Sequence, residues 1–198
     1  MTRFPRLGGP ALHANDDSPA PLDLDLDLVE RLRAGEMDAL GLLYQRHGGA
    51  VRSVILRADP DASASLADDI CQETFLAFHE GLARYEHRAR LRSWLYAIAL
   101  RKLRAAHRKR WWRLGLRRRE GRGAAGVALR HDDPHRRVEA AEQIGQLLRA
   151  LPVAQREVLT LVALEGLPVS EAAHILGISE NAASTRLYRA RRALEAAR

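Results

Sequence analysis

Cysteine is nearly absent from the chain, since Cys71 is the only one among 198 residues. A single cysteine excludes an internal disulfide, leaves too few thiols for a cysteine-based zinc site and fits a reducing compartment. We expect Cys71 to pack in the interior, and a redox switch is the alternative.

Long apolar runs are missing as well. No stretch approaches the roughly 20 residues that a helix needs to cross a bilayer. The start, Met1–Pro5, is not followed by an apolar segment of signal-peptide length. We therefore expect a soluble, cytoplasmic protein without membrane insertion.

The sequence also lacks a recognisable catalytic pattern. It has no Gly-rich phosphate loop, no nucleophile–base pair at a known spacing and no metal constellation. His131 and His135 flank Asp132-Asp133-Pro134, but a proline in a Gly- and Arg-rich stretch disfavours a preformed metal site. We expect no enzyme activity, no cofactor and no bound metal.

Aromatic residues make up only 5% of the chain, whereas Ala, Leu and Arg are abundant. This composition favours helices over an extended sheet. We predict an all-α fold of two small helical domains joined by a flexible basic linker. The predicted segments are a disordered arm (1–26), a first domain (27–110), the linker (111–137) and a second domain (138–198).

Within the first domain, helical periodicity begins near Leu28 and stops at Asp59-Pro60-Asp61. Ser65 can cap the next helix, which ends at Gly81, and a third helix begins near Leu91. The helices expected in the second domain are Val138–Leu151, Val153–Glu165, Val169–Leu176 and Glu180–Ala197.

Acidic residues are absent from residues 88–119, which hold 13 Lys or Arg residues. Trp94 and Tyr96 lie among them, as do Trp111 and Trp112. The net charge of the whole chain is +7. A basic surface of this kind favours a polyanion, and aromatic side chains suit exposed bases. Trp94 follows the apolar stripe, so we expect it in the core. For Trp111 and Trp112, packing on the third helix and contact with nucleic acid remain equal alternatives.

An acidic amphipathic segment, Asp68–Phe78, precedes the basic one. A nucleic acid would repel this segment, so its exposed side either binds a protein or is simply solvated. Two opposed surfaces in one small domain indicate an adaptor between a protein machine and nucleic acid.

Residues 169–187 have the spacing of a helix-turn-helix. Ala173 allows close helix approach, Gly177 supplies the tight turn, Ile178 plugs the corner and Ser179 can cap the second helix. An ordinary helical hairpin is the alternative. In the DNA-binding interpretation, the second helix directs Ser184, Thr185, Tyr188 and Arg189 to the major groove, and Arg186, Arg191 and Arg192 towards the backbone.

With both halves assembled, the chain resembles the extracytoplasmic-function (ECF) group of bacterial RNA polymerase sigma factors, in the sigma-70 superfamily. Asp68–Phe75 is similar to the family's region 2.2, Arg92–Ala99 to the segment leading into region 2.3, and Leu151–Leu159 to the start of region 4. The resemblance covers about residues 28–110 and 138–197. It implies promoter-specific transcription initiation with core RNA polymerase, bound through the β′ clamp helices and the β subunit.

The resemblance also implies site residues. The polymerase-binding residues would be Asp68, Asp69, Gln72, Glu73, Leu76 and Glu80. The DNA-binding residues would be Arg101, Lys102, Arg104, Arg108 and Lys109 at the minus-10 element, and Ser179, Ser184, Thr185, Arg186, Tyr188, Arg189 and Arg191 at the minus-35 element.

Two positions depart from the family pattern. Arg101 stands where an Asn commonly reads a base, so it either favours guanine or contacts phosphate. Ser184 replaces a commonly basic residue, so promoter preference does not transfer. Because the chain has no sensory domain, we also expect a separate anti-sigma protein to mask it.

A helix-turn-helix repressor or activator that acts without core polymerase is the competing function. A response regulator would need an α/β receiver, and the sequence shows no strand–helix alternation. Neither a repressor nor a response regulator would explain the acidic segment Asp68–Phe78.

Overall fold

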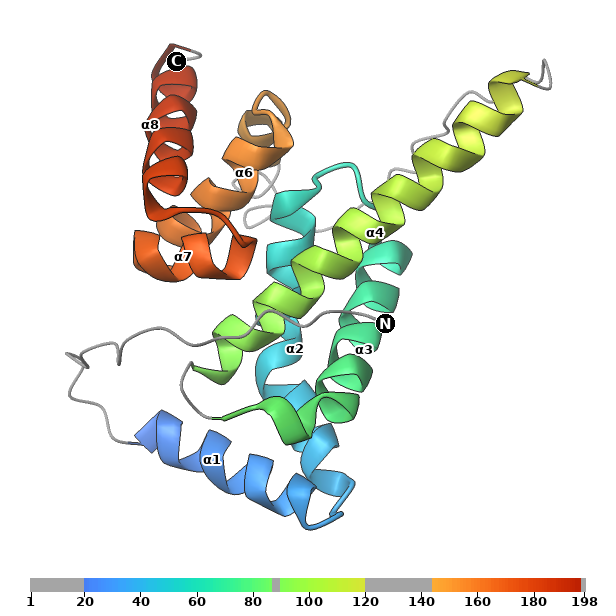
Figure 1. The fold of residues 1–198 in the computed structure, drawn as a ribbon, viewed down its shortest axis with the longest axis vertical. Coiled ribbons are helices and arrows are strands. Elements are labelled where there is room, and N and C mark those ends of the chain that lie inside the picture. The colour runs from blue at the N-terminus through green and yellow to red at the C-terminus, as the bar shows by residue number, and fades with distance from the viewer. Residues whose placement is uncertain (1–19, 87–89, 120–143, 197–198) are drawn as a thin grey trace, which may run out of the picture.

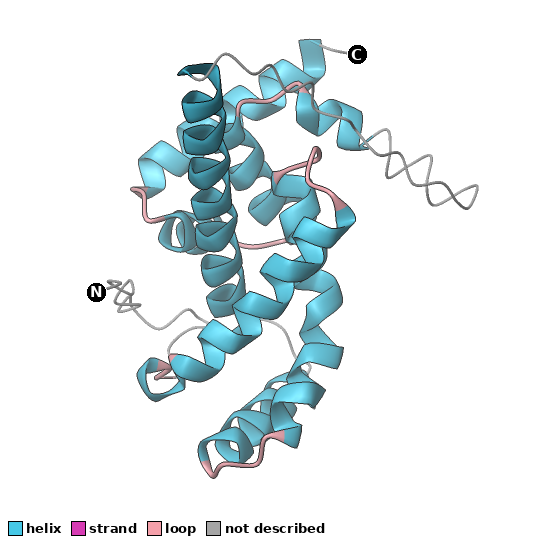
Figure 2. Ribbon diagram, turned by 90° about the vertical axis from the view of Figure 1, so that its right-hand side faces the viewer, coloured by secondary structure: helices cyan, strands magenta, loops and turns pink. Residues whose placement is uncertain are grey.

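The computed structural model describes residues 20–86, 90–119 and 144–196, and within them it is helical without strands (Figure 2). Five helices and turns form the N-terminal part: α1 (Ala20–Arg33), α2 (Asp38–Ala58), α3 (Ala64–Glu80), the 3-10 turn η1 (Leu82–Arg84) and α4 (Leu91–Arg119). The C-terminal part has a helical segment at residues 144–149, α6 (Val153–Leu159), the π-helical turn η2 (Thr160–Leu164), α7 (Val169–Leu176) and α8 (Glu180–Ala196). The all-α prediction is therefore confirmed.

The N-terminal bundle (α1–α4) is assembled around apolar stripes at helical spacing. On α2, Leu43, Val51, Val54 and Ile55 are completely buried, as the periodicity predicts. On α3, the stripe that includes Phe75 and Phe78 faces inward. Helices α2, α3 and α4 pack against one another, and α1 packs on α2 (Figure 1).

The prediction that the first helix starts near Leu28 was wrong, because α1 begins at Ala20. Tertiary contact explains the longer helix. Asp25 accepts hydrogen bonds from Arg46, at 2.9 Å, and His47, at 3.0 Å, both on α2. Leu24 remains exposed, so the alternating Leu-Asp pattern places only part of its leucines in the core. Residues 1–19 of the predicted arm lie outside the described residues.

The cap of α3 is Ser63, not Ser65. Ser63 has extended backbone angles, and its hydroxyl accepts a hydrogen bond from the Leu66 amide at 3.1 Å. The geometry of an N-cap requires this non-helical conformation, and Ser65 lies within the helix.

The predicted linker starts too early, since α4 continues to Arg119. Lys and Arg are good helix formers, and a single interior glycine such as Gly115 costs only about 1 kcal/mol. The side chains of residues 110–119, including Trp111 and Trp112, lie outside the described side chains, as do the remaining linker residues 120–137.

The C-terminal unit (residues 144–196) packs α8 against α6 and α7. The single helix predicted at Val153–Glu165 divides into α6 and η2, where the Glu165 amide donates to the Thr160 carbonyl at 3.0 Å. The wider turn ends at Glu165, whose side chain faces the N-terminal bundle. The C-terminal unit rests on the bundle, with α7 against α4 and both α6 and η2 against α2 (Figure 1).

Candidate nucleic-acid and polymerase interfaces

Five of the six predicted polymerase-binding residues form one exposed stripe along α3. Apart from the adjacent pair Gln72 and Glu73, successive members are three or four residues apart, the spacing of a single helix face. Their side chains are exposed, and Leu76 retains 57% of its accessible surface. The stripe consists of Asp69, Gln72, Glu73, Leu76 and Glu80. Acidic groups around an exposed leucine suit a protein partner with a basic, partly apolar surface.

The sixth residue, Asp68, lies off this stripe. Its carboxylate accepts a hydrogen bond from Arg52 of α2 at 2.6 Å, so it ties α3 to α2. Glu73 has an internal partner too, because Lys102 of α4 donates to it at 3.0 Å. Both pairs are solvent-accessible and contribute little to stability.

The predicted DNA-binding residues of α4 differ in accessibility. Arg108 and Lys109 are exposed. Arg101 is partly buried, and this burial lowers its pKa. Arg104 makes a bidentate contact with Glu157 of α6, with distances of 2.8 and 2.6 Å. This hydrogen bond raises the pKa of Arg104.

Three glutamates of the C-terminal unit, Glu157, Glu165 and Glu171, contact the N-terminal bundle; we call them the interface glutamates. Glu165 accepts from Arg57 at 2.6 Å and from the Tyr96 hydroxyl. Glu171 accepts from the Ser93 hydroxyl. Their exposed side-chain fractions are small, 4% for Glu157 and 9% for Glu165. Burial, followed by the hydrogen bond to Glu165, raises the pKa of Tyr96.

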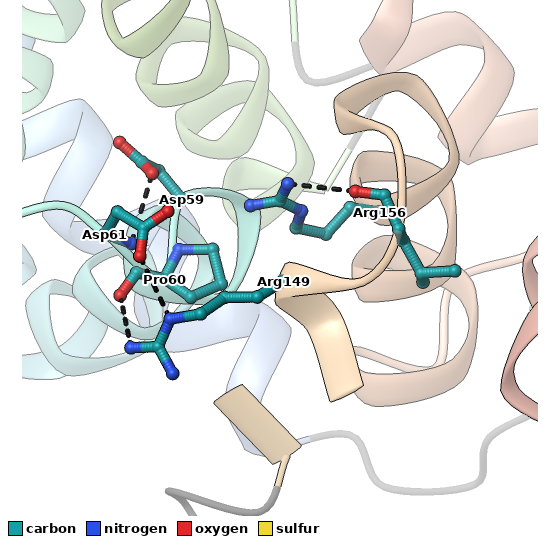
Figure 3. A network of polar contacts seen from close by, with 6 residues as sticks. Asp59, Pro60, Asp61, Arg149 and Arg156 are labelled. Atoms are coloured by element: carbon teal, nitrogen blue, oxygen red, sulfur yellow. Dashed lines mark hydrogen bonds and ion pairs between the residues drawn. The ribbon is translucent and has the colours of Figure 1, made fainter. Parts of the chain in front are cut away.

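A separate ion pair joins the two units at their solvent edge. Arg149 donates to the Asp61 carboxylate at 2.9 Å and to the Pro60 carbonyl at 3.1 Å (Figure 3). Asp61 is held in place by the turn after α2, where its amide donates to Asp59. Both charged side chains remain largely exposed, so this pair is sensitive to salt.

The helix-turn-helix forms as the sequence predicts. Gly177 adopts a left-handed conformation (φ 67°, ψ 38°), which glycine tolerates without steric cost. The Ile178 amide donates to the Ala173 carbonyl at 3.0 Å, closing the turn as in a Schellman motif. Ser179 caps α8 by accepting from the Ala182 amide at 3.2 Å.

Helix α8 has one buried apolar face and one exposed polar face. Ala183, Leu187 and Ala190 pack inward. The predicted base-reading residues, Ser184, Thr185, Tyr188 and Arg189, are exposed, as is Arg191. Tyr188 retains 62% of its surface. Arg186 is partly buried, so it is less accessible than its neighbours.

Two packing predictions are confirmed. Trp94 is 5% exposed and lies edge-on to Tyr85, with ring centroids 5.5 Å apart. Cys71 is buried, its thiol contacts the Gly48 carbonyl at 3.5 Å, and burial raises its pKa. A thiol that stays protonated and inaccessible reacts slowly, which favours packing over a redox switch.

Sequence reasoning missed the interface glutamates. A signal exists, because Glu157 and Glu171 each lie four residues before a buried apolar side chain, Leu161 and Ile175. Acidic residues on an inward face indicate polar partners. The partners themselves come from the other half of the chain, so the sequence alone could not identify them.

The two-part helical fold with its helix-turn-helix defines a class of helical transcription factors, and comparison with known proteins agrees. The family model "Sigma-70 region 2" matches residues 43–113, and "Sigma-70, region 4" matches residues 141–194. The RNA polymerase sigma factor CnrH of Cupriavidus metallidurans is 33% identical over 184 residues, covering 89% of this chain and 95% of CnrH. The ECF RNA polymerase sigma factor SigC of Mycobacterium tuberculosis is 37% identical over 129 residues, 65% of this chain and 68% of SigC.

A solved structure shows the same architecture. CnrH in complex with the cytosolic domain of CnrY matches with a TM-score of 0.64 and 30% identity, over 88% of this chain and 96% of that chain. The chain belongs to the ECF group of RNA polymerase sigma factors, which direct core polymerase to promoters. These matches support the sigma factor and not a repressor that acts without polymerase. Among the described residues, no helix has the length and apolarity needed to cross a membrane.

Proposed function

We propose that this sigma factor binds core RNA polymerase through the exposed stripe of α3. The observation that carries the proposal is that one side of a well-packed helix faces solvent and gathers the stripe Asp69, Gln72, Glu73, Leu76 and Glu80. The β′ clamp helices are the partner surface, and the C-terminal unit contacts the β subunit. Asp68 contributes indirectly, by fixing α3 to α2.

Promoter DNA is bound by two separate surfaces in this proposal. The basic residues of α4, Arg101, Lys102, Arg104, Arg108 and Lys109, contact the minus-10 element. The exposed face of α8 reads the minus-35 element as duplex, with Ser184, Thr185, Tyr188 and Arg189 in the major groove and Arg186 and Arg191 near the backbone. Ser179 presents the amino end of α8 to a phosphate, a favourable position for an anion.

The protein acts in the cytoplasm, where RNA polymerase is, and has no catalytic activity of its own, because the polymerase performs the chemistry. A separate anti-sigma protein masks it; the relative CnrH has been solved with the cytosolic domain of CnrY. If purified protein and core polymerase alone did not initiate transcription, an additional activator would be required, and masking by an inhibitor would not explain the regulation.

In vitro transcription tests the polymerase assignment. The protein is mixed with core RNA polymerase and a genomic promoter library, and start sites are mapped. We expect Asp69→Lys/Glu73→Lys to abolish specific initiation, because two attractive charges become repulsive at the docking surface. Glu36→Lys/Asp38→Lys is the matched control, since it makes the same charge change at exposed positions in the turn after α1 and at the first residue of α2. Equal loss in both variants would argue against a specific role for α3.

A further inference from the structure

One face of α4 is covered by the C-terminal unit. Tyr96 follows Ser93 by three positions and Arg104 follows it by eleven. These separations place all three residues on the same side of the helix. Ser93 is 3% exposed and Tyr96 is completely buried. Two of these donors are therefore withdrawn from solvent in the described arrangement, while the Arg104 side chain retains 36% of its surface.

Each of these donors is matched by an interface glutamate. Ser93 donates to Glu171, Tyr96 to Glu165 and Arg104 to Glu157. Arg57 of α2 adds a second cation against Glu165. Three carboxylates with little exposed surface, two of them on buried residues, therefore lie against a helix that is otherwise strongly basic.

The chemistry of these contacts is that of phosphate recognition. Hydroxyl and guanidinium groups are the donors that hold phosphate oxygens in nucleic-acid complexes. An arginine fork binds a carboxylate and a phosphate in the same bidentate way. A glutamate on Arg104 and a DNA phosphate on Arg104 are mutually exclusive.

We propose that the interface glutamates occupy the phosphate-binding groups of α4, so that the packed arrangement of the two units is autoinhibited for single-stranded promoter DNA. The proposal rests on the assignment of α4 to the minus-10 element. In the closed form, the C-terminal unit competes with DNA for Ser93, Tyr96 and Arg104. When the units separate, the same donors become available.

The two DNA-binding surfaces are affected unequally. The base-reading residues of α8 point to solvent, so closure leaves duplex recognition possible. The interface is also held by Arg149–Asp61, whose side chains are largely exposed, so salt weakens this pair.

Binding of a fluorescein-labelled, mixed-sequence single-stranded DNA oligonucleotide to the full chain tests the proposal by anisotropy over a salt series. Glu157→Gln keeps the shape of the side chain and removes the charge that holds Arg104. We expect roughly tenfold tighter binding than wild type, and a slope of log affinity against log salt that is steeper by about 0.7 for each phosphate gained. Glu195→Gln is the matched control, with the same charge change at an exposed position of α8. Identical affinity and slope in the two variants would overturn the proposal.

A second pair of variants avoids the buried glutamates. Arg149→Asp places two acids against each other at the edge of the interface, and both positions are exposed, so the fold should tolerate the change (Figure 3). We expect opening, seen as a larger radius of gyration by X-ray scattering, together with tighter single-strand binding. Adding Asp61→Arg restores an opposite pair at the original net charge and should restore both wild-type values. Tighter binding without expansion, or expansion without tighter binding, would contradict the competition.

Transcription with core polymerase separates this proposal from the assigned function. One outcome is that wild type initiates at promoters while Glu157→Gln and Arg149→Asp bind the oligonucleotide with wild-type affinity. That result would support the sigma function and contradict autoinhibition. If the variants expand while no form of the protein binds single-stranded DNA, the assignment of α4 to DNA is wrong, and the competition is wrong with it.

Discussion

Helices α4 and α8 are both rich in arginine and were both predicted to bind DNA, yet the fold presents them differently. On α8, the polar residues around Tyr188 face solvent, while Leu187 and its neighbours hold the helix to the C-terminal unit. On α4, apolar residues such as Leu95 anchor one side and the interface glutamates cover another. Positive charge in a sequence therefore indicates a nucleic-acid partner but does not show whether the surface is accessible.

The difference follows from what each helix has to pack against. Helix α8 is at the outer side of the C-terminal unit and has packing partners on one side only (Figure 1). Helix α4 contacts α2 and α3 in its own bundle and α7 in the other unit. A helix with neighbours on several sides must satisfy its polar groups internally, because buried donors without acceptors are costly.

The largest expected effect comes from truncating Leu187, the buried side chain that holds α8 to the C-terminal unit. Leu187→Ala should destabilise the protein by about 2–5 kcal/mol, because it deletes a buried side chain and leaves a cavity. Duplex binding should be lost with the packing of α8. Tyr188→Ala, one residue along and exposed, should change stability by less than about 0.5 kcal/mol while weakening duplex binding. Urea unfolding and duplex anisotropy measure both quantities, and equal stability losses would show that α8 is not anchored as described.

The next largest effect on stability distinguishes an arginine of α4 from an arginine of α8. Arg104→Ala leaves the Glu157 carboxylate, which is 4% exposed, without its guanidinium, and should cost about 1–3 kcal/mol. Arg189→Ala on α8 removes the same charge from an exposed position and should cost less than about 0.5 kcal/mol. Combining Arg104→Ala with Glu157→Gln should recover part of the loss in a thermal melt. Indistinguishable unfolding temperatures for the two alanine variants would mean that the Arg104 pair is not buried in solution.

Glycine substitutions test the turn that positions α8. Gly177→Ala should cost about 1–2 kcal/mol, because alanine is strained in the left-handed conformation. An added Cβ meets nothing within 4 Å there, so backbone strain alone is measured. Gly41→Ala, inside α2 and equally open, should instead stabilise the protein by about 0.4–1 kcal/mol. We expect the denaturant midpoint to fall for Gly177→Ala and to rise for Gly41→Ala. An unchanged midpoint for Gly177→Ala would show that the turn relaxes to accommodate alanine.

The smallest expected effect is a titration that reports whether α4 is covered. Burial raises the pKa of Tyr85 to about 12, and burial with the Glu165 contact also raises that of Tyr96. The closed arrangement therefore binds the Tyr96 proton more tightly than an open one. Its advantage is fully present below the ordinary value of 10.0 and is lost as pH rises through the raised pKa.

Arg149→Asp should thus lower the pKa of Tyr96, while Tyr85, in the interior of the N-terminal bundle, keeps its raised value. Ultraviolet absorbance of tyrosinate follows the titration, with circular dichroism to detect unfolding. An unchanged titration of Tyr96 in an expanded variant would place that residue outside the interface.

Local sequence signals predicted much of this protein. The stripe Leu43–Ile55 located α2, Gly177-Ile178-Ser179 located the turn before α8, and the alternation of charge separated α3 from α4. These features depend on neighbours within a few turns of helix, where spacing is fixed by backbone geometry. The errors fell where local signals are weak: α1 begins at Ala20, and α4 reaches Arg119.

By itself, the sequence determined the helical class, the helix-turn-helix, the charge of each surface and the family, because each of these is written in residues close together along the chain. Only the tertiary structure decided which charged side chains are available. Arg104 and Glu157 are 53 residues apart, and Tyr96 and Glu165 are 69. Nothing in the local spacing of either residue indicates its partner, since such contacts depend on how two independently patterned helical units come to rest on each other.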